Sequence, residues 1–211
     1  SKNILADVQP GNLVNVFWKS RLIEQMGKFK IELISSVSGK IFDEKLKLQA
    51  LNSVCSLLEK FLPERQNYSQ IFNATNAFID LLTFQDESKN DYWMEGYVKW
   101  EIGVLSSIGF SLDLNRCAVT GSDTNLLFVS PKTGKAVSKE GAGRHAPRLL
   151  LLPSFLGGDN VIGSNFYKEI LAGLNITSYF FKNKLLLSIN TNKPINLPNP
   201  RIRFVELIEK L

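Results

Sequence analysis

The spacing of apolar residues changes after about residue 40, and this change restricts the fold more than any other feature of the chain. In VNVFWKSRL (14–22) and GKFKIELISS (27–36), apolar and polar residues alternate, which is typical of strands with one buried face. Residues 25–27 form a short connector between them. From residue 43 onward, apolar residues recur every three to five positions, as in helices. The sequence therefore predicts a β-hairpin followed by a helical body.

Six helical segments are predicted after the hairpin, and residues 113–147 are predicted to be an irregular loop. Asp43 is expected to cap the first helix, Gly109 the third, and Pro200 to begin the last. The fold class is therefore mainly α with a small β part. The predicted helices cover residues 44–62, 69–84, about 91–108, 148–156, 166–187 and 200–211.

Composition describes an ordinary globular chain. The 211 residues are 44% hydrophobic, which is enough for a core, and no apolar run reaches the roughly 18 residues of a spanning helix. The first residues lack a basic start followed by a long apolar stretch, so a soluble cytoplasmic protein is expected. Two cysteines cannot form a disulfide framework. Cys55 is interpreted as a small buried hydrophobe in a helix, with redox chemistry as the alternative.

The net charge of +5 is unevenly distributed. Basic residues outnumber acidic ones in residues 1–35, 113–150 and 179–211, whereas acidic residues prevail in residues 36–112. Ordered rows of cations bind a phosphate backbone by releasing its counterions. A nucleic-acid partner fits this distribution, and scattered solubilising charge is the alternative.

Residues for catalysis are scarce. His145 is the only histidine and lies between arginines in GRHAPR, so it is interpreted as a solvated loop residue. No nucleophile elbow, phosphate loop or zinc-protease helix motif occurs. Asp86, Glu87, Asp91 and Glu95 form an acidic cluster that suits either a divalent metal or the dipole at a helix start. We therefore predict that the protein is not an enzyme.

Several segments resemble one family, RecO, the bacterial mediators of recombination in DNA repair. They follow the family's order and span nearly the whole chain. The segments are QPGNLVNVFWKSRL (9–22), FLPERQ (61–66), YVKWEIGVLSSIGFSLDLNRC (97–117), CAVTG (117–121), FVSPKTGKAVS (128–138) and RLLLLP (148–153).

The resemblance implies two domains. Family members have an N-terminal OB-fold barrel, of which residues 1–38 would supply only a hairpin, because about three further strands usually precede it. Residues 43–211 would form the helical RecO-type domain. The chain is therefore expected to be N-terminally incomplete, with its two strands resting on the helices, on another copy or on residues outside this numbering.

The resemblance also implies a zinc ribbon of the C-x-x-C…C-x-x-C kind in the loop 113–147. Here Cys117 remains, but Thr120, Ser138 and Gly141 stand at the other three ligand positions. One thiolate cannot complete a tetrahedral site, so we predict no metal and no cofactor. The two hydroxyls are expected to bond to nearby backbone groups instead. The residues expected to pack beneath the loop are Leu126, Leu127, Phe128 and Val137.

The function implied by the resemblance requires no bond-breaking chemistry. RecO proteins bind single- and double-stranded DNA, anneal complementary strands, contact the acidic C-terminal tail of single-strand-binding protein, and act with RecR to help load RecA. The expected location is the cytoplasm, at the nucleoid. A helical protein-protein adaptor without DNA binding is the alternative, and a hydrolase using the acidic cluster is a third hypothesis.

Cations beside aromatic residues are the predicted DNA-binding groups, because aromatic rings stack on bases of any sequence. Trp18 and Phe29 can equally be core residues, and the loop cations can equally be solvated charges. The predicted DNA-binding residues are Trp18, Lys19, Arg21, Lys28, Lys30, Lys132, Lys135, Lys139, Arg144 and Arg148.

Lys99 and Trp100 are predicted to bind the acidic tail, because one cation with apolar walls suits a peptide that ends in a carboxylate. Helical spacing supports a second interpretation, in which Trp93, Tyr97, Trp100 and Val104 form a buried helix face. Glu101 could then pair with a cation at that face.

Overall fold

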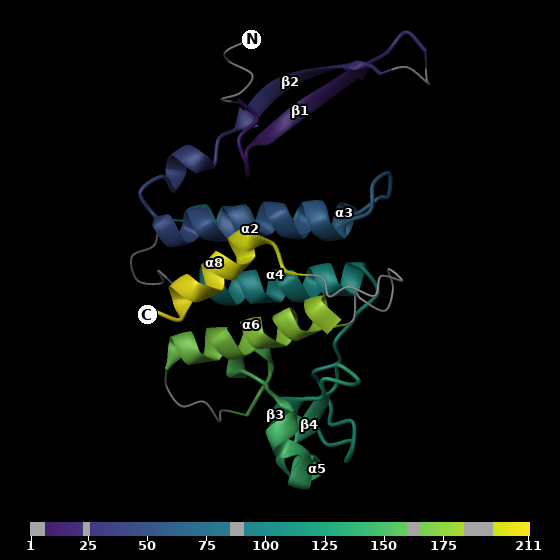
Figure 1. The fold of residues 1–211 in the computed structure, drawn as a ribbon, viewed down its shortest axis with the longest axis vertical. Helices are drawn as coiled ribbons and strands as arrows, with labels where there is room; N and C mark the ends of the chain where they lie inside the picture. Colours follow the sequence, from purple (N-terminus) through teal and green to yellow (C-terminus); the bar gives the residue numbers. More distant parts are fainter. Residues whose placement is uncertain (1–6, 23–25, 85–90, 160–164, 184–195) are drawn as a thin grey trace.

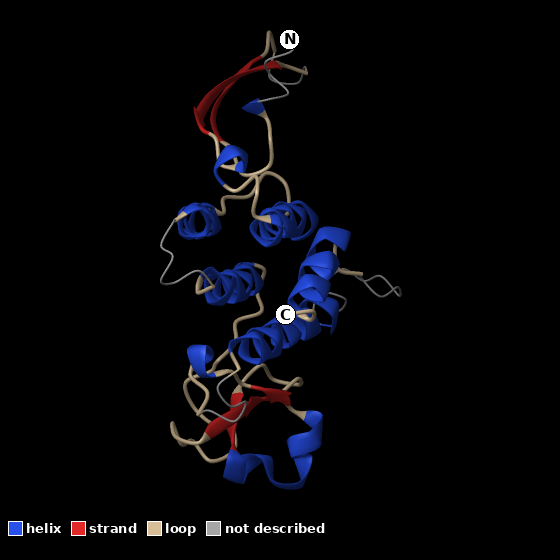
Figure 2. Ribbon diagram, turned by 90° about the vertical axis from the view of Figure 1, so that its left-hand side faces the viewer, coloured by secondary structure: helices blue, strands red, loops and turns tan. Residues whose placement is uncertain are grey.

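A computed structural model describes residues 7–22, 26–84, 91–159, 165–183 and 196–211. The molecule is elongated, with a hairpin at one end, a helical body in the middle and a small sheet at the other end (Figures 1 and 2). The predicted class, mainly helical with small antiparallel sheets, is confirmed. The elements of the body are α2 (Lys45–Phe61), α3 (Ser69–Thr83), α4 (Trp93–Ser107), α6 (Phe166–Asn183) and α8 (Asn199–Ile208).

The hairpin pairs β1 (Leu13–Lys19) antiparallel with β2 (Lys28–Ser35), as predicted. A turn precedes it, in which the Asn12 N–H donates to the Gln9 carbonyl. Gly11 in this turn has a φ of +86°, and a Cβ there would lie 2.7 Å from a methyl of Leu51 in α2. Glycine thus allows the base of the hairpin to touch the helical body. A short 3₁₀ helix, η1 (Ser38–Lys40), leads from β2 toward α2.

The helical body buries the α4 face that the spacing predicts. Trp93, Tyr97, Trp100 and Val104 are each at most 4% exposed, so the core interpretation of this face is confirmed. The Tyr97 ring lies 4.6 Å from the Phe204 ring of α8, centroid to centroid. Helix α4 packs between α3 and α6, and α8 lies against α2 (Figure 1).

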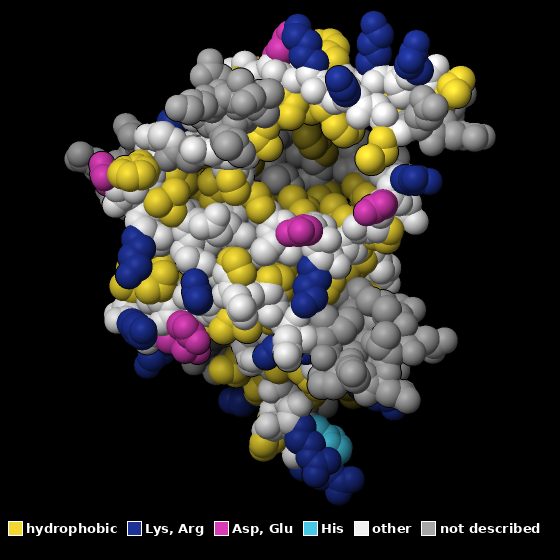
Figure 3. Space-filling view, turned by 45° about the horizontal axis from the view of Figure 1, so that its top comes forward, with side chains coloured by type: hydrophobic (Ala, Val, Ile, Leu, Met, Phe, Trp, Pro, Cys, Tyr) yellow, Lys and Arg dark blue, Asp and Glu magenta, His cyan; other side chains and the backbone are white. Residues whose placement is uncertain are grey.

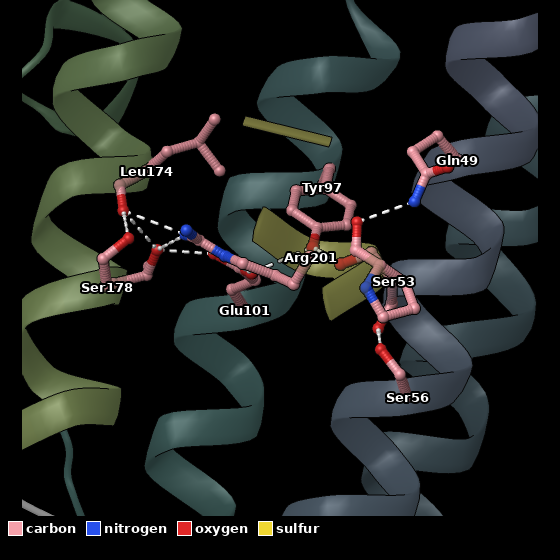
Figure 4. A network of polar contacts seen from close by, with 10 residues as sticks. Gln49, Ser53, Ser56, Tyr97, Glu101, Leu174, Ser178 and Arg201 are labelled. Atoms are coloured by element: carbon pink, nitrogen blue, oxygen red, sulfur yellow. Dashed lines mark hydrogen bonds and ion pairs between the residues drawn. The ribbon is translucent and has the colours of Figure 1, made fainter. Parts of the chain in front are cut away.

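A buried ion pair joins α4 to α8 (Figure 4). The Arg201 Nε and Nη2 groups donate to the two carboxylate oxygens of Glu101 at 3.0 and 3.1 Å, and neither residue is more than 2% exposed. Burial lowers the pKa of Arg201, but the charge and hydrogen bonds of Glu101, together with a smaller contribution from Tyr97, outweigh burial and raise the pKa. Tyr97 and Thr177 also donate to Glu101, so α6 joins the network. The predicted cation for Glu101 is therefore Arg201.

The end of the molecule opposite the hairpin contains a small sheet where the sequence predicts a loop and a helix. Strands β3 (Leu126–Val129), β4 (Ala136–Ser138) and β5 (Leu150–Leu151) form an antiparallel sheet in the order β4-β3-β5. We call residues 113–159 the small lobe. Its other elements are α5 (Lys139–Ala142) and the 3₁₀ helices η3 (Gly143–Arg148) and η4 (Ser154–Leu156).

The predicted helix over residues 148–156 is wrong. Leu150 and Leu151 pair with Val129 and Phe128 of β3, and only the short η4 follows. A run of leucines is compatible with either structure, since it has no polar residues to reveal its period. The partner strand therefore decides the conformation.

Helix boundaries follow local signals only in part. Asp43 is not the cap of α2, because Glu44 precedes the helix without a capping side-chain bond and pairs with Lys47 at 2.7 Å. Gly109 does end α4, with a φ of +93°. Pro200 lies in the first turn of α8, as predicted. The predicted extension of α6 over residues 184–187 lies outside the described residues.

Within the described ranges, no helix combines the length and the hydrophobicity that crossing a bilayer requires.

Candidate nucleic-acid interface

Cross-strand pairing places three predicted DNA-binding lysines on one side of the hairpin. Phe17 pairs with Lys30 and Lys19 with Lys28. Because side chains alternate along a strand, all four project from the same face. All are exposed, and the Lys30 ammonium lies 5.9 Å from the centroid of the Phe17 ring and 2.6 Å from the Glu32 carboxylate. We call Phe17, Lys19, Lys28 and Lys30 the basic face.

Trp18 lies on the opposite side of the hairpin. It pairs with Phe29, and the two side chains are 52% and 65% exposed, so neither is a core residue among the described parts of the chain. Trp18 thus does not share a surface with Lys19 or Lys28. Its ring instead lies over Gly27, where a Cβ would be 2.3 Å from the indole nitrogen. This side, the apolar face, consists of Val14, Val16, Trp18, Phe29, Ile31 and Leu33.

The alternation of residues along the hairpin sequence already predicts that Trp18 and the lysines lie on opposite faces. Strand residues of the same parity share a face, so Phe17 belongs with Lys19, whereas Trp18 does not. Phe17 is therefore the aromatic neighbour of the lysines, although it is not among the predicted DNA-binding residues. Arg21 is exposed just beyond the end of β1.

The second set of predicted cations lies on the small lobe, at the opposite end of the molecule from the hairpin (Figure 1). All five side chains are exposed. Lys135 lies 3.7 Å from the Asp113 carboxylate, so its charge is partly compensated. We call this set the lobe cations: Lys132 and Lys135 in the turn between β3 and β4, Lys139 in α5, and Arg144 and Arg148 in η3.

The four loop positions that the resemblance aligns with zinc ligands come together around Cys117. Its sulfur accepts hydrogen bonds from the N–H groups of Thr120 and Ser138 at 3.4 and 3.2 Å, and from the Ser138 hydroxyl at 3.3 Å. The Thr120 and Ser138 hydroxyls are 3.4 Å apart, and the Gly141 N–H donates to Ser138. The Ser122 N–H likewise donates to the Thr120 hydroxyl, so the predicted bonds of both hydroxyls to backbone groups are confirmed.

Apolar packing accompanies these bonds. Leu126 and Val137 are 2% and 4% exposed, and Phe128 packs against the core, which confirms the prediction for these three residues. Leu127 is half-buried. Among the described residues, no group of three or more His, Cys, Asp or Glu side chains could hold a metal ion.

The Cys117 thiol should make stability depend on pH. Burial raises its pKa, but hydrogen bonds from Ser138 and Thr120 outweigh burial and lower the pKa from 9.0 to about 6. The folded state therefore binds fewer protons than the unfolded state between these values. The stabilisation that the Cys117 thiol provides is complete above pH 9 and disappears as the pH falls through 6. We expect the free energy of unfolding of the unaltered protein, relative to that of C117A, to rise by roughly 2.5 kcal/mol between pH 5 and pH 8.

Chemical denaturation of both proteins across this pH range measures the difference. Subtracting the C117A values removes the titration of all other groups. A difference that does not vary with pH would show that the thiol keeps its ordinary pKa.

The predicted tail-binding pair is divided between the surface and the core. Lys99 is exposed. Its ammonium nitrogen lies 3.6 Å from the Glu95 carboxylate and 5.7 Å from the centroid of the Phe155 ring. Trp100 is 4% exposed, and its indole N–H donates to the Thr75 hydroxyl at 3.0 Å. The two side chains therefore do not form one open pocket.

The acidic cluster does not assemble among the described residues. Asp86 and Glu87 lie outside them. Asp91 accepts a hydrogen bond from the Tyr167 hydroxyl, and Glu95 is the partner of Lys99. His145 is exposed, as predicted, and lies on η3 between the lobe cations Arg144 and Arg148.

A large groove lies between the base of the hairpin and helices α2 and α3. Its volume is about 820 Å³, and Asp80 is the only charged residue among those that line it in the described chain. Hydrophobic side chains surround this hollow in Figure 3. Cys55 also lines it and is half-buried rather than fully buried as predicted, although burial still raises the pKa of its thiol.

Comparison with known proteins identifies relatives of the chain. The family model "Recombination protein O C terminal" matches residues 46–193. The chain is 37% identical to DNA repair protein RecO of Rhodospirillum rubrum over 209 residues, which is 99% of this chain and 81% of that protein. It is 40% identical to DNA repair protein RecO of Cereibacter sphaeroides strain ATCC 17029 over 210 residues, 100% of this chain and 82% of the relative. No solved structure matches it.

Proposed function

Because this chain belongs to the RecO family of DNA repair proteins, we propose that it acts as a non-catalytic recombination mediator that binds and anneals single-stranded DNA. The observation that carries the proposal is the basic face. Three exposed lysines and an exposed phenylalanine on one side of a hairpin can bind successive phosphates and stack on a base. The lobe cations offer a second surface for single- or double-stranded DNA, since phosphate contacts require little beyond charge.

The proposal extends to the fold. The hairpin would be part of an OB-fold within a domain of residues 1–38, and residues 43–211 would form the helical domain. The bonds around Cys117 support the interpretation of the lobe as a zinc ribbon without metal, since one thiolate and two hydroxyls are not a zinc donor set.

The proposed partners besides DNA are RecR, the acidic tail of single-strand-binding protein and, indirectly, RecA. Lys99 remains the proposed cation for the tail carboxylate. The groove between the hairpin and α3 suits the tail less well, because its one charged lining residue in the described chain is Asp80, which repels a carboxylate. The proposed location is the cytoplasm, at the nucleoid.

Charge reversal on the two cationic surfaces should weaken DNA binding and its salt dependence. Each phosphate contact to single-stranded DNA contributes about 0.7 to the slope of log K against log salt. We expect K19E/K28E/K30E to reduce the magnitude of this negative slope by up to about 2. K132E/K135E/K139E should reduce it by a similar or smaller amount. Fluorescence anisotropy of a labelled oligonucleotide, titrated with salt, measures both.

The matched control is K45E/K182E/K210E, which reverses three exposed lysines elsewhere. It changes the net charge equally and should leave most of the slope unchanged. Equal losses in all three variants would mean that net charge alone attracts DNA, contrary to the proposal.

A protein-protein adaptor without DNA binding is the second candidate function, and the large apolar groove favours it. Absence of oligonucleotide binding even in dilute buffer would select this function over the first.

A further inference from the structure

We propose that a small pocket between the helical body and the small lobe receives one unstacked base of single-stranded DNA. The inference rests on the proposed function and assigns a role to residues outside both predicted DNA-binding sets, apart from Lys132. The pocket has a volume of about 250 Å³. It is lined by Gly109, Phe110, Ser111, Leu112, Lys132, Thr133, Gly134 and Phe180.

The inner part of the pocket is apolar and aromatic. Phe180 of α6 is 2% exposed, and Phe110 and Leu112 are half-buried in the segment between α4 and the lobe. Aromatic and aliphatic side chains stack against the flat face of any nucleobase. An apolar cavity with two phenylalanines therefore matches the least polar part of a nucleotide.

The mouth of the pocket is polar and cationic. The exposed side chains of Ser111 and Thr133 border it and can bond to the edge of a base. Lys132 lies at the same mouth, and Lys135 and Lys139 follow it on the lobe, where a phosphate backbone would pass. The arrangement places apolar surface inside and positive charge outside, which is the order that a nucleotide requires.

The shape of the pocket is fixed by the turn between β3 and β4. Gly134 has a φ of +71°, and a Cβ there would lie 2.9 Å from a methyl of Leu112. Its N–H donates to the Ser130 carbonyl at 2.8 Å. The same Cβ would lie 3.6 Å from the Phe180 ring of α6, so the lobe approaches the body closely at this turn.

The size of the pocket favours a single base. Sites for drug-sized ligands usually exceed about 300 Å³, so this one suits a smaller group. Bases in a duplex are stacked and must be extruded at a cost of a few kcal/mol before they can enter. The pocket should consequently favour single strands over duplexes of the same sequence.

Photocrosslinking tests the proposal on the full chain. A single-stranded oligonucleotide with 5-iododeoxyuridine is irradiated with the protein, and the crosslinked peptides are identified by mass spectrometry. We expect crosslinks to residues 109–112 or 132–134, and few with the matching duplex. S111W, which fills the mouth from an exposed position, should abolish them and weaken single-strand affinity roughly 5- to 100-fold.

V119W is the matched control, because Val119 is 67% exposed on the same lobe and does not line the pocket. It should keep both the crosslinks and the affinity. K132Q, a second variant at an exposed side chain, should weaken affinity even if S111W does not fold.

Three outcomes would overturn the inference. If DNA binds with strong salt dependence but crosslinks elsewhere, the pocket assignment fails and the proposed function stands. If S111W weakens the binding of an acidic, apolar peptide but not the binding of DNA, the pocket is a peptide site. If the unaltered chain does not bind single-stranded DNA, the proposed function itself fails.

Discussion

Changing Thr120, Ser138 and Gly141 together to cysteine is expected to give the chain one tightly bound zinc ion. Their side-chain positions already surround Cys117, with the Ser138 hydroxyl 3.3 Å from its sulfur and a Cβ at Gly141 2.9 Å from it. Sulfurs in a tetrahedral zinc site are about 3.8 Å apart, given Zn–S bonds of about 2.3 Å. The distance from position 138 to the Cys117 sulfur therefore needs to lengthen by about half an ångström, and Cys117 must shift to admit a Cβ at position 141. An apparent binding free energy of about 10 kcal/mol is expected at pH 7.

Zinc content by mass spectrometry of metals and the thiolate-to-metal absorption of a cobalt complex measure this result. The control adds C117A to the triple variant, which leaves three thiolates and should bind much more weakly. The unaltered chain should retain no zinc after dialysis. A triple variant that folds but stays free of metal would show that the four positions do not have tetrahedral geometry.

Removal of Arg201 is expected to cause the largest loss of stability of any single substitution discussed. R201A leaves Glu101, which is fully buried, without its cation. Breaking a buried pair from one side costs about 3 to 5 kcal/mol. For a chain of this size, that corresponds to a fall in Tm of roughly 6 to 20 °C, measured by thermal unfolding.

R203A is the matched control, since Arg203 lies on the same helix and is exposed. It should change Tm by a degree or two. The double variant E101L/R201L should recover much of the loss, because buried ion pairs can often be replaced by apolar residues at little cost. A small effect of R201A would mean that water reaches Glu101 and that the helices are not tightly packed there.

Local patterns in the sequence predict much of the helical body and the hairpin. The buried face of α4 follows from the spacing of Trp93, Tyr97 and Trp100, because each turn of a helix returns to the same side. The antiparallel pairing of β1 and β2 follows from their alternation and short connection. The bonds of Thr120 and Ser138 could be predicted because they join groups within one loop.

Predictions failed where a residue's environment comes from distant parts of the chain. The leucines at 150 and 151 form a strand because β3 offers free backbone groups beside them. The division of Lys99 and Trp100 between surface and core, by contrast, follows from local geometry, because adjacent residues on a helix project about 100° apart. The small sheet was missed because its strands are at most four residues long, too short to show a period.

The sequence alone therefore determined the hairpin and the long helices of the body, the segments that carry cations and the zinc-ligand positions that lack cysteine. All of these depend on residue type and on spacing within a few positions. Only the tertiary structure decided that Arg201 neutralises Glu101 and that Phe110 and Phe180 line a pocket beside Lys132. These contacts arise when helices and strands distant in the chain pack to bury their apolar faces, and no local period encodes which partner each face will find.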